Sequence, residues 1–290
     1  MKMNRRSFIS ATLAASGVAL TDPRALLAQP VRGKAKFRIG VTDWNLGQSA
    51  KPEAVALAAK IGFEGVQISL GTDVSSGQLP LADPARQKIY LDAAKQAGIP
   101  IASCRVEMLH RNYLPSRDPL APKWIAQSVP IAKALGFQVI LLPFFGEGAI
   151  KTPEEMDYVG DVLRELAPEA QKAGVIFGLE DTISAKDNVR IMERSKSPAV
   201  LTYYDIGNST GNGFNVLEEI RWLGRARICE VHIKDNPNYL GEGKIDVPAV
   251  IGALTEIGFD RWAHLETSNP TKNVEADMSR NLAYVRKLLA

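Results

Sequence analysis

Short apolar runs alternate with amphipathic segments along most of this 290-residue chain. The runs predict buried parallel β-strands, because strands covered on both faces carry continuous apolar residues. We expect eight strands, at residues 37–41, 65–70, 99–106, 139–143, 175–180, 200–205, 227–234 and 262–266. The other segments have the apolar spacing of helices, at residues 52–61, 84–97, 123–135, 153–173, 185–194, 216–223, 247–257 and 275–289.

The residues at the joints agree with this alternation. A glycine suited to a left-handed C-cap stands between helix and strand at Gly62, Gly98, Gly136, Gly174 and Gly258. Eight strand–helix units in order predict an α/β protein with a single (β/α)₈ TIM barrel, a fold of about 250 residues. No Gly-x-Gly-x-x-Gly follows the first strand, which counts against a dinucleotide-binding fold.

The first 28 residues have a different pattern. They contain Asn4-Arg5-Arg6-Ser7-Phe8-Ile9, then a mild apolar stretch and small residues near Ala28. This order resembles a bacterial twin-arginine signal peptide, and the stretch is too short to span a bilayer. We therefore expect a signal peptide at 1–28, a linker at 29–36 and the barrel at 37–290. Such a protein would use the twin-arginine export machinery and reside in the periplasm or be otherwise exported.

Removal of the leader changes the charge of the protein. Residues 1–28 and the whole chain each have a net charge of +3, so the remainder is close to neutral. A neutral protein gives no reason to expect nucleic acid as a partner, and no later run of about 18 apolar residues predicts membrane contact after processing. Cys104 and Cys229 lie on distant predicted strands, so we expect two unpaired, buried thiols. The sequence leaves a homo-oligomer open.

Four predicted strands end in a residue that can bind a hard metal ion: Glu180, Asp205, His232 and Glu266. The carboxyl ends of all strands meet at one face of a (β/α)₈ barrel, where active sites form. Three carboxylates and one imidazole suit a divalent ion. We expect one such ion, with Mn²⁺ as first choice and Mg²⁺, Co²⁺ or Zn²⁺ as alternatives.

Structural roles remain open for the same residues. Glu180 could be a helix cap or surface charge, and Asp205 could form an Asx-turn. Strand alternation places Glu230, His232 and Lys234 on one face, where they need partners because unpaired buried charge is costly. Lys234 could then bind a substrate oxygen or form a salt bridge with Glu230.

Two neighbouring aromatic residues have similar alternatives. His264 shares a strand face with Glu266 and should lie one layer deeper, as a packing or supporting residue. Trp44, just after the first strand, could stack on a sugar face or only pack at the barrel mouth.

The four residues, with His232 in His-x-Lys-Asp and Glu266 in Glu-x-Ser, resemble the sugar phosphate isomerase/epimerase family of xylose isomerase-like barrels. The resemblance runs from about residue 37 to the C-terminus, and the family includes ketose 3-epimerases, hydroxypyruvate isomerases and inosose dehydratases. It implies that Glu180 and Glu266 bind the metal and face the substrate from opposite sides. Asp205 and His232 would complete the metal sphere.

The resemblance implies a metal-dependent isomerase or epimerase of a small sugar or keto-polyol. Glu180 would remove a proton beside a carbonyl and Glu266 would return one, while the metal stabilises the enediolate. In ketose epimerases a histidine and an arginine that hold substrate oxygens stand at the positions of Asn208 and Asn238. Asn208, Lys234 and Trp44 are the expected substrate-binding residues, and export favours a free ketose, keto-acid or cyclitol.

Two alternatives to an epimerase remain. The same residues could support a metal-dependent dehydratase or lyase, or the chain could be a non-catalytic exported sugar-binding barrel. A DNA-repair endonuclease of the related superfamily would need many histidines, and this chain has three.

Overall fold

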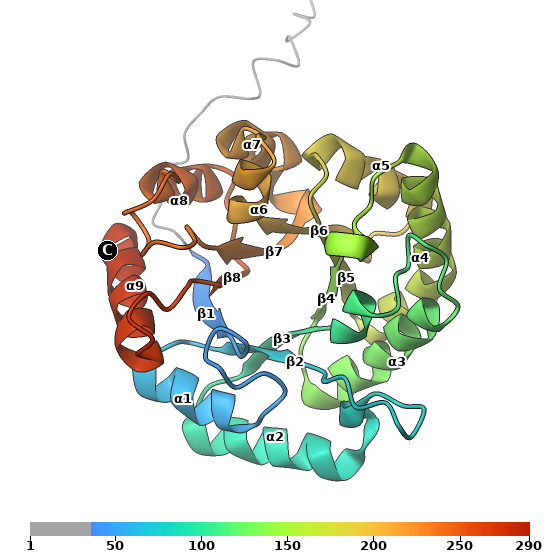
Figure 1. Ribbon diagram of the computed structural model, residues 1–290, viewed down its shortest axis with the longest axis horizontal. Helices are drawn as coiled ribbons and strands as arrows, with labels where there is room; N and C mark the ends of the chain where they lie inside the picture. Colours follow the sequence, from blue (N-terminus) through green and yellow to red (C-terminus); the bar gives the residue numbers. More distant parts are fainter. Residues whose placement is uncertain (1–35) are drawn as a thin grey trace, which may run out of the picture. The chain divides into compact units, whose positions relative to one another are not determined.

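The computed structural model describes residues 36–290, so the predicted signal peptide and nearly all of the linker lie outside the described part. Eight strands form one closed parallel barrel in sequence order, with helices around it (Figure 1). The predicted single (β/α)₈ TIM barrel is confirmed. The strands are β1 Arg38–Thr42, β2 Val66–Ser69, β3 Ile101–Arg105, β4 Val139–Pro143, β5 Ile176–Glu180, β6 Val200–Asp205, β7 Ile228–Ile233 and β8 Trp262–Leu265.

All eight predicted helices are present, and one short helix, α6, was not predicted. The helices are α1 Glu53–Ile61, α2 Pro84–Ala97, α3 Leu120–Leu135, α4 Pro153–Ala173, α5 Ala185–Ser195, α6 Ile206–Gly211, α7 Val216–Arg227, α8 Val247–Glu256 and α9 Val274–Leu289. Single 3₁₀ turns follow three strands, as η2 Pro80–Ala82, η3 Glu107–His110 and η4 Gly146–Gly148. The five predicted cap glycines all have positive φ, as the left-handed cap requires.

The strand register aligns the upper residues of neighbouring strands. Asp205 pairs with His232 across β6 and β7, and His232 pairs with His264 across β7 and β8. β1 closes the barrel on β8 with Gly40 opposite His264. A Cβ at Gly40 would overlap the His264 ring, so glycine makes room there for a buried imidazole.

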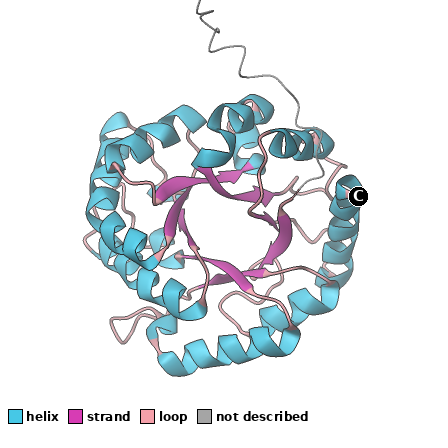
Figure 2. Cartoon of the chain, turned by 180° about the vertical axis from the view of Figure 1, so that it is seen from behind, coloured by secondary structure: helices cyan, strands magenta, loops and turns pink. Residues whose placement is uncertain are grey.

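The apolar core has two parts. The larger part of the core packs between the strands and the surrounding helices. Figure 2 shows the inner barrel and the outer ring of helices from behind. A smaller part lies inside the barrel and consists of Val139, Leu141, Leu201, Tyr203 and Cys229. As expected, Cys104 and Cys229 are buried and unpaired. The lower barrel is thus packed with side chains, which leaves the carboxyl ends of the strands as the place for a site.

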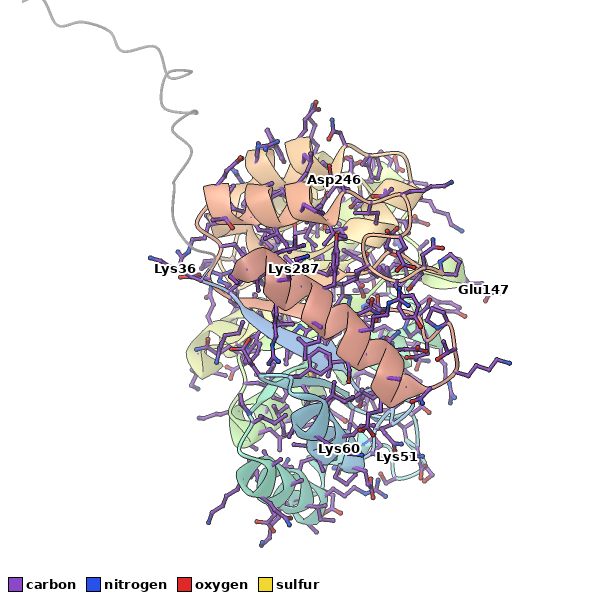
Figure 3. All side chains as sticks on the ribbon, turned by 90° about the vertical axis from the view of Figure 1, so that its left-hand side faces the viewer. Lys36, Lys51, Lys60, Glu147, Asp246 and Lys287 are labelled. Carbon is purple, nitrogen blue, oxygen red and sulfur yellow. The ribbon has the colours of Figure 1, made fainter. Side chains whose placement is uncertain are left out.

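The last helix completes the outer ring. Figure 3 shows α9 crossing the outside of the barrel, with Lys36 and Glu147 on opposite sides of the molecule. An ion pair of 2.6 Å between Lys60 and Glu275 joins α1 to α9. In residues 36–290, every helix is too short or too polar to cross a membrane.

Candidate active site

The structure brings the four metal-capable residues together at the carboxyl ends of β5 to β8. Glu180 and Asp205 are the last residues of their strands, His232 lies in β7, and Glu266 directly follows β8. One ligand atom from each residue lies within 4.8 Å of the corresponding atoms of the other three. Glu180, Asp205 and His232 are buried and Glu266 is half-buried. The arrangement offers three carboxylates and one imidazole to a single point.

His232 is held at both ring nitrogens. Its Nδ1 lies 2.7 Å from Glu180 Oε1, and its Nε2 lies 2.7 Å from Gln67 Oε1 on β2. Nδ1 is also 3.6 Å from Asp205 Oδ2 and 3.5 Å from Glu266 Oε2, so it faces all three carboxylates. Burial opposes a charge on His232, yet Glu266 and Glu180 raise its pKa to about 10. Gln67 was missed from the sequence; it fixes the ring so that Nδ1 points into the site.

Burial dominates the environment of Glu180 and a cation dominates that of Asp205. Burial raises the pKa of Glu180 to about 7, although His232 acts in the opposite direction. Burial also disfavours a charge on Asp205, but Lys234 and His232 hold the pKa of that carboxyl below its ordinary range. The site therefore combines a firmly ionised carboxylate with one whose charge is costly.

Lys234 lies between two of the carboxylates. Its Nζ is 2.7 Å from Asp205 Oδ2 and 2.6 Å from Glu266 Oε2. A Cβ at Gly207 would overlap the Lys234 side chain, so glycine allows the lysine stem to pack against α6. The alternative salt bridge with Glu230 is wrong, because Lys234 reaches past the end of β7 to the neighbouring strands.

Trp44, just after β1, contacts Glu266, and Arg105 at the end of β3 covers Trp44. The indole Nε1 of Trp44 donates to Glu266 Oε1 at 2.8 Å. The guanidinium of Arg105 lies 3.8 Å from the centre of the Trp44 ring, so it covers one face of the indole. Stacking on a sugar is thus restricted to the other face, and the hydrogen bond gives Trp44 a role in orienting Glu266.

Asp205 also begins helix α6. Its Oδ1 accepts hydrogen bonds from the backbone N–H of Gly207 and of Asn208, at 2.7 and 2.8 Å. The Asx-type turn and the position in the site are therefore both present. The side-chain Nδ2 of Asn208 is buried, and no hydrogen-bond partner for it exists within residues 36–290.

A second polar layer lies below the four residues. His264 Nδ1 is 2.9 Å from Tyr203 Oη and 3.5 Å from Glu230 Oε2. Burial lowers the pKa of His264 and raises that of Glu230 to about 8. His264 therefore lies one layer deeper, as expected, and supports the site from below instead of entering it.

Comparisons with known proteins agree with this geometry. The sequence pattern of the xylose isomerase-like TIM barrel family matches residues 55–288. The chain belongs to that family. It is 25% identical over 228 residues to 2-epi-5-epi-valiolone 7-phosphate 2-epimerase of Actinoplanes sp., which covers 75% of this chain and 82% of the relative.

Solved structures share the fold of this xylose isomerase-like barrel. An L-ribulose 3-epimerase superposes with a TM-score of 0.72 at 18% identity, covering 87% of this chain and 94% of that one. A 3-keto-D-glucoside 4-epimerase from E. coli superposes with a TM-score of 0.70 at 19% identity, covering 87% and 100%.

The xylose isomerase-like barrel of this chain has a second polar cluster after β1 and β3, at the same end of the barrel as the candidate metal centre. Asp43 accepts hydrogen bonds from Ser69 N and Oγ and from Ala50 N, each between 2.7 and 2.9 Å. Glu107 accepts hydrogen bonds from Ser49 Oγ, Arg105 and Gly71 N. Every oxygen of these two carboxylates thus has a donor.

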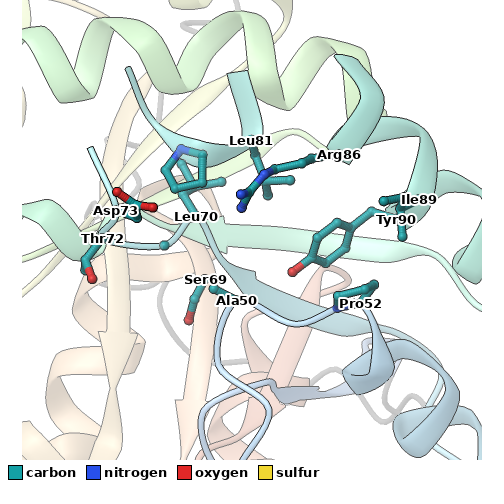
Figure 4. Close-up of a pocket in the computed structure, with 12 residues that line it drawn as sticks. Ala50, Pro52, Ser69, Leu70, Thr72, Asp73, Leu81, Arg86, Ile89 and Tyr90 are labelled. Carbon is teal, nitrogen blue, oxygen red and sulfur yellow. The ribbon is translucent and has the colours of Figure 1, made fainter. Parts of the chain in front are cut away.

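A cavity of about 550 Å³ lies outside this second cluster, between the end of β2 and α2. Arg86 and Tyr90 project into it from α2, toward Ser69 and Asp73 (Figure 4). Its lining, as far as the chain is described, contains none of the four residues of the candidate metal centre.

Proposed function

We propose that this protein is a divalent-metal-dependent epimerase or isomerase of a small sugar-like ketone. The observation that carries the proposal is the convergence of Glu180, Asp205, His232 and Glu266 on one point. The names of its relatives support the reaction class: the Actinoplanes relative and both solved structures are sugar or cyclitol epimerases by name.

The residues present fit a divalent metal ion. Three carboxylates surround His232 Nδ1, and the cationic groups in contact with them, as far as the chain is described, are His232 and Lys234. Asp205 Oδ2 is buried and forms no well-directed hydrogen bond within residues 36–290. Oxygen and imidazole donors in this number suit Mn²⁺, which we propose as the ion, and also Mg²⁺, Co²⁺ or Zn²⁺.

Each residue has a defined task in this proposal. Glu180, Asp205, His232 and Glu266 hold the ion, which when bound supplies Lewis-acid stabilisation of charge on the substrate carbonyl oxygen. Glu180, as a carboxylate, would take a proton from the carbon beside the carbonyl, and Glu266, as a carboxylic acid, would deliver its proton to the same carbon from the other side. No electrons are gained or lost, and the configuration at that carbon is inverted.

The neighbouring side chains position these groups. Trp44 and Lys234 each donate to one oxygen of Glu266, which orients this side chain in the site. Lys234 and Asn208 are the proposed donors to substrate oxygens, and the Trp44 ring is the proposed apolar contact. General acid–base work of this kind contributes about 10²–10⁴-fold in rate.

Deuterium exchange tests the proposal. The purified protein should contain about one divalent ion per chain by elemental analysis. With Mn²⁺ in D₂O, a panel of ketoses, inososes and hydroxypyruvate should include a substrate that gains deuterium beside its carbonyl, and chelation should stop the exchange. Loss of water from the substrate would instead identify a dehydratase. A protein without metal and without exchange on any substrate would be a binding barrel, and the proposal would be wrong.

We also propose that residues 1–28 direct export to the periplasm through the twin-arginine machinery. The support is the Arg5-Arg6 pair with its apolar stretch. Substitution of both arginines by lysine should leave the protein in the cytoplasmic fraction. A periplasmic pool equal to that of the wild type would contradict this localisation.

A further inference from the structure

We infer that the substrate carries a second, uncharged and hydroxyl-rich unit, a sugar ring, and that this ring occupies a cavity beside Lys234. The inference rests on the proposed function and names its substrate class: a keto-sugar in glycosidic linkage. The observations that carry it are the position of the cavity, the polar groups around it and the way nearby charge is already compensated.

The cavity has a volume of about 430 Å³ and lies between α6 and the segment that follows β7. Gly207, Asn208 and Gly211 line one side, and Lys234, Asn238 and Lys244 line the other. Its volume is within the range of about 300–1,000 Å³ that small-molecule sites occupy. Because Lys234 lines the cavity and also contacts Asp205 and Glu266, one side chain links the cavity to the candidate metal centre.

The cavity is not the place where the reacting carbon binds. Among the described residues, its lining contains Lys234 but not Glu180, Asp205, His232 or Glu266. The carbon that exchanges its proton must lie within reach of Glu180 and Glu266. A group in the cavity must therefore be attached to the reacting unit instead of being that unit.

Side-chain amides supply free hydrogen-bonding groups. Asn208 Nδ2 is buried without a partner within residues 36–290, and the exposed Asn238 presents its amide to solvent at the cavity. Asn236, in contrast, is already engaged, since its Oδ1 accepts from Ser268 N and Oγ at 2.7 Å. An amide both donates and accepts, which matches the hydroxyl groups of a sugar.

The same surroundings disfavour a phosphate. The two sets of backbone N–H groups that could cradle an anion are occupied by carboxylates. Asp205 accepts from Gly207 and Asn208, and Asp235 accepts from the amides of residues 243–245. Lys234 is neutralised by two carboxylates, so Lys244, exposed at the edge, is the one remaining cation of the lining. A dianion would lack the donors that phosphate sites provide.

A matched pair of substrates tests the inference. One is a keto-sugar linked to a glucose ring, and the other is the same keto-sugar with a methyl group in place of that ring. Deuterium incorporation by the metal-loaded protein should show a kcat/KM at least about tenfold higher for the two-ring compound, because binding of the remote ring can be used in the transition state. Calorimetry should show tighter binding of that compound too.

A filled cavity should abolish the preference. Gly211 lines the cavity and a Cβ there meets no atom within 4 Å, so Gly211→Leu adds a bulky side chain at the cavity without a clash at its Cβ. We expect the kcat/KM ratio of the two substrates to fall about tenfold in this variant. Gly252→Leu, on the exposed side of α8, has equally open space and should leave the ratio unchanged. Asn238→Leu should lower the ratio without filling as much volume.

The outcomes separate this inference from the proposed function. If exchange occurs but the methyl compound or a phosphate ester is preferred, or the ratio survives Gly211→Leu, the inference is wrong and the epimerase proposal stands. If no substrate exchanges, the epimerase proposal is wrong. Calorimetry with the two-ring compound then tests independently whether the cavity binds a sugar ring. Equal binding to the wild type and to Gly211→Leu would then refute it.

Discussion

Two carboxylate clusters lie at the same end of this barrel and differ in what compensates their charge. On the β1–β3 side, Asp43 and Glu107 receive hydrogen bonds from backbone amides, serine hydroxyls and Arg105 at every oxygen. On the β5–β8 side, three carboxylates meet around one imidazole and one lysine, the other donors are one indole N–H and two amides of α6, and Asp205 Oδ2 has no directed hydrogen bond within residues 36–290. Both clusters thus place buried carboxylates at the carboxyl ends of strands, but one is surrounded by protein donors and in the other three carboxylates face one another around a single imidazole.

The difference separates a structural network from a ligand site. A buried carboxylate is stable when protein donors satisfy its oxygens, and it then has little need of a cation. Glu180, Asp205 and Glu266 keep oxygens directed at the common point, where His232 has its pKa raised to about 10. That rise reflects a strong demand for positive charge, which a divalent ion would meet.

Substitution of one glutamate in each cluster should give the largest difference in exchange rate and metal content. Glu180→Gln keeps the shape of the side chain but removes its charge and basicity, so deuterium exchange should fall about 10²–10⁴-fold and bound metal should decrease. Glu107→Gln should instead lower the free energy of unfolding by about 1–3 kcal/mol, because an amide group would face donors that a carboxylate satisfies. Its metal content should stay at the wild-type value.

Both variants are measured by elemental analysis, exchange rate and urea unfolding. Loss of metal in Glu107→Gln, or normal exchange in Glu180→Gln, would contradict the different functions that the hydrogen bonds assign to the two clusters.

The sequence predicted one cluster and not the other for a physical reason. Glu180, Asp205, His232 and Glu266 each follow an apolar run, so each is visible as a polar residue at a strand end. The Asp43 cluster depends on Ser69 N, Ala50 N and Gly71 N, and backbone donors leave no signal in a sequence. The fold itself was predictable because eight strand–helix units and their cap glycines repeat one pattern.

Local contacts across the barrel were the part that the sequence did not determine. Gln67 and Ser69 alternate with Val66 and Ile68, so they share one strand face, but this alternation does not reveal that Gln67 contacts His232 on β7. Helix α6 is too short to show helical periodicity. Lys234 follows β7, four residues beyond Glu230, and its ammonium group contacts Asp205 at the end of β6 and Glu266 after β8.

Substitution of Gln67 should have an intermediate effect on metal binding, because Gln67 contacts His232 but is not one of the four proposed ligands. Gln67→Leu removes the acceptor of His232 Nε2, so the ring loses the bond that directs Nδ1 at the carboxylates. Loss of such a supporting contact typically costs about 10–100-fold in metal affinity. Competition with a fluorescent chelator measures the affinity. Gln127→Leu removes a glutamine that bonds Leu79 N far from His232 and should leave the affinity unchanged.

An unchanged metal affinity in Gln67→Leu would show that the three carboxylates alone orient His232. A fall in thermal stability without a fall in affinity would assign Gln67 to packing.

The last prediction concerns Asp43 and leaves metal binding and exchange unchanged, because it tests only whether the hydrogen bonds to this carboxylate offset the cost of its burial. Burial raises the pKa of Asp43 to about 7 from an ordinary value of 3.8, although hydrogen bonds from Ser69 and Ala50 act in the opposite direction. Between about pH 4 and 7 the folded protein then keeps a proton that the unfolded chain has lost. The free energy of unfolding of the wild type relative to Asp43→Asn should therefore fall as pH rises through this window and level off above about 7, with a slope on the order of 1 kcal/mol per pH unit.

Urea unfolding at several pH values, with exposed Asp92→Asn as the control, measures this difference. A difference between wild type and Asp43→Asn that stays constant from pH 4 to 8 would contradict the raised pKa. It would mean that the three donors hold Asp43 ionised throughout, so that hydrogen bonds offset the full cost of burial. The contrast between the clusters would then be greater, because one would hold stable buried charge with protein donors alone and the other would need an ion.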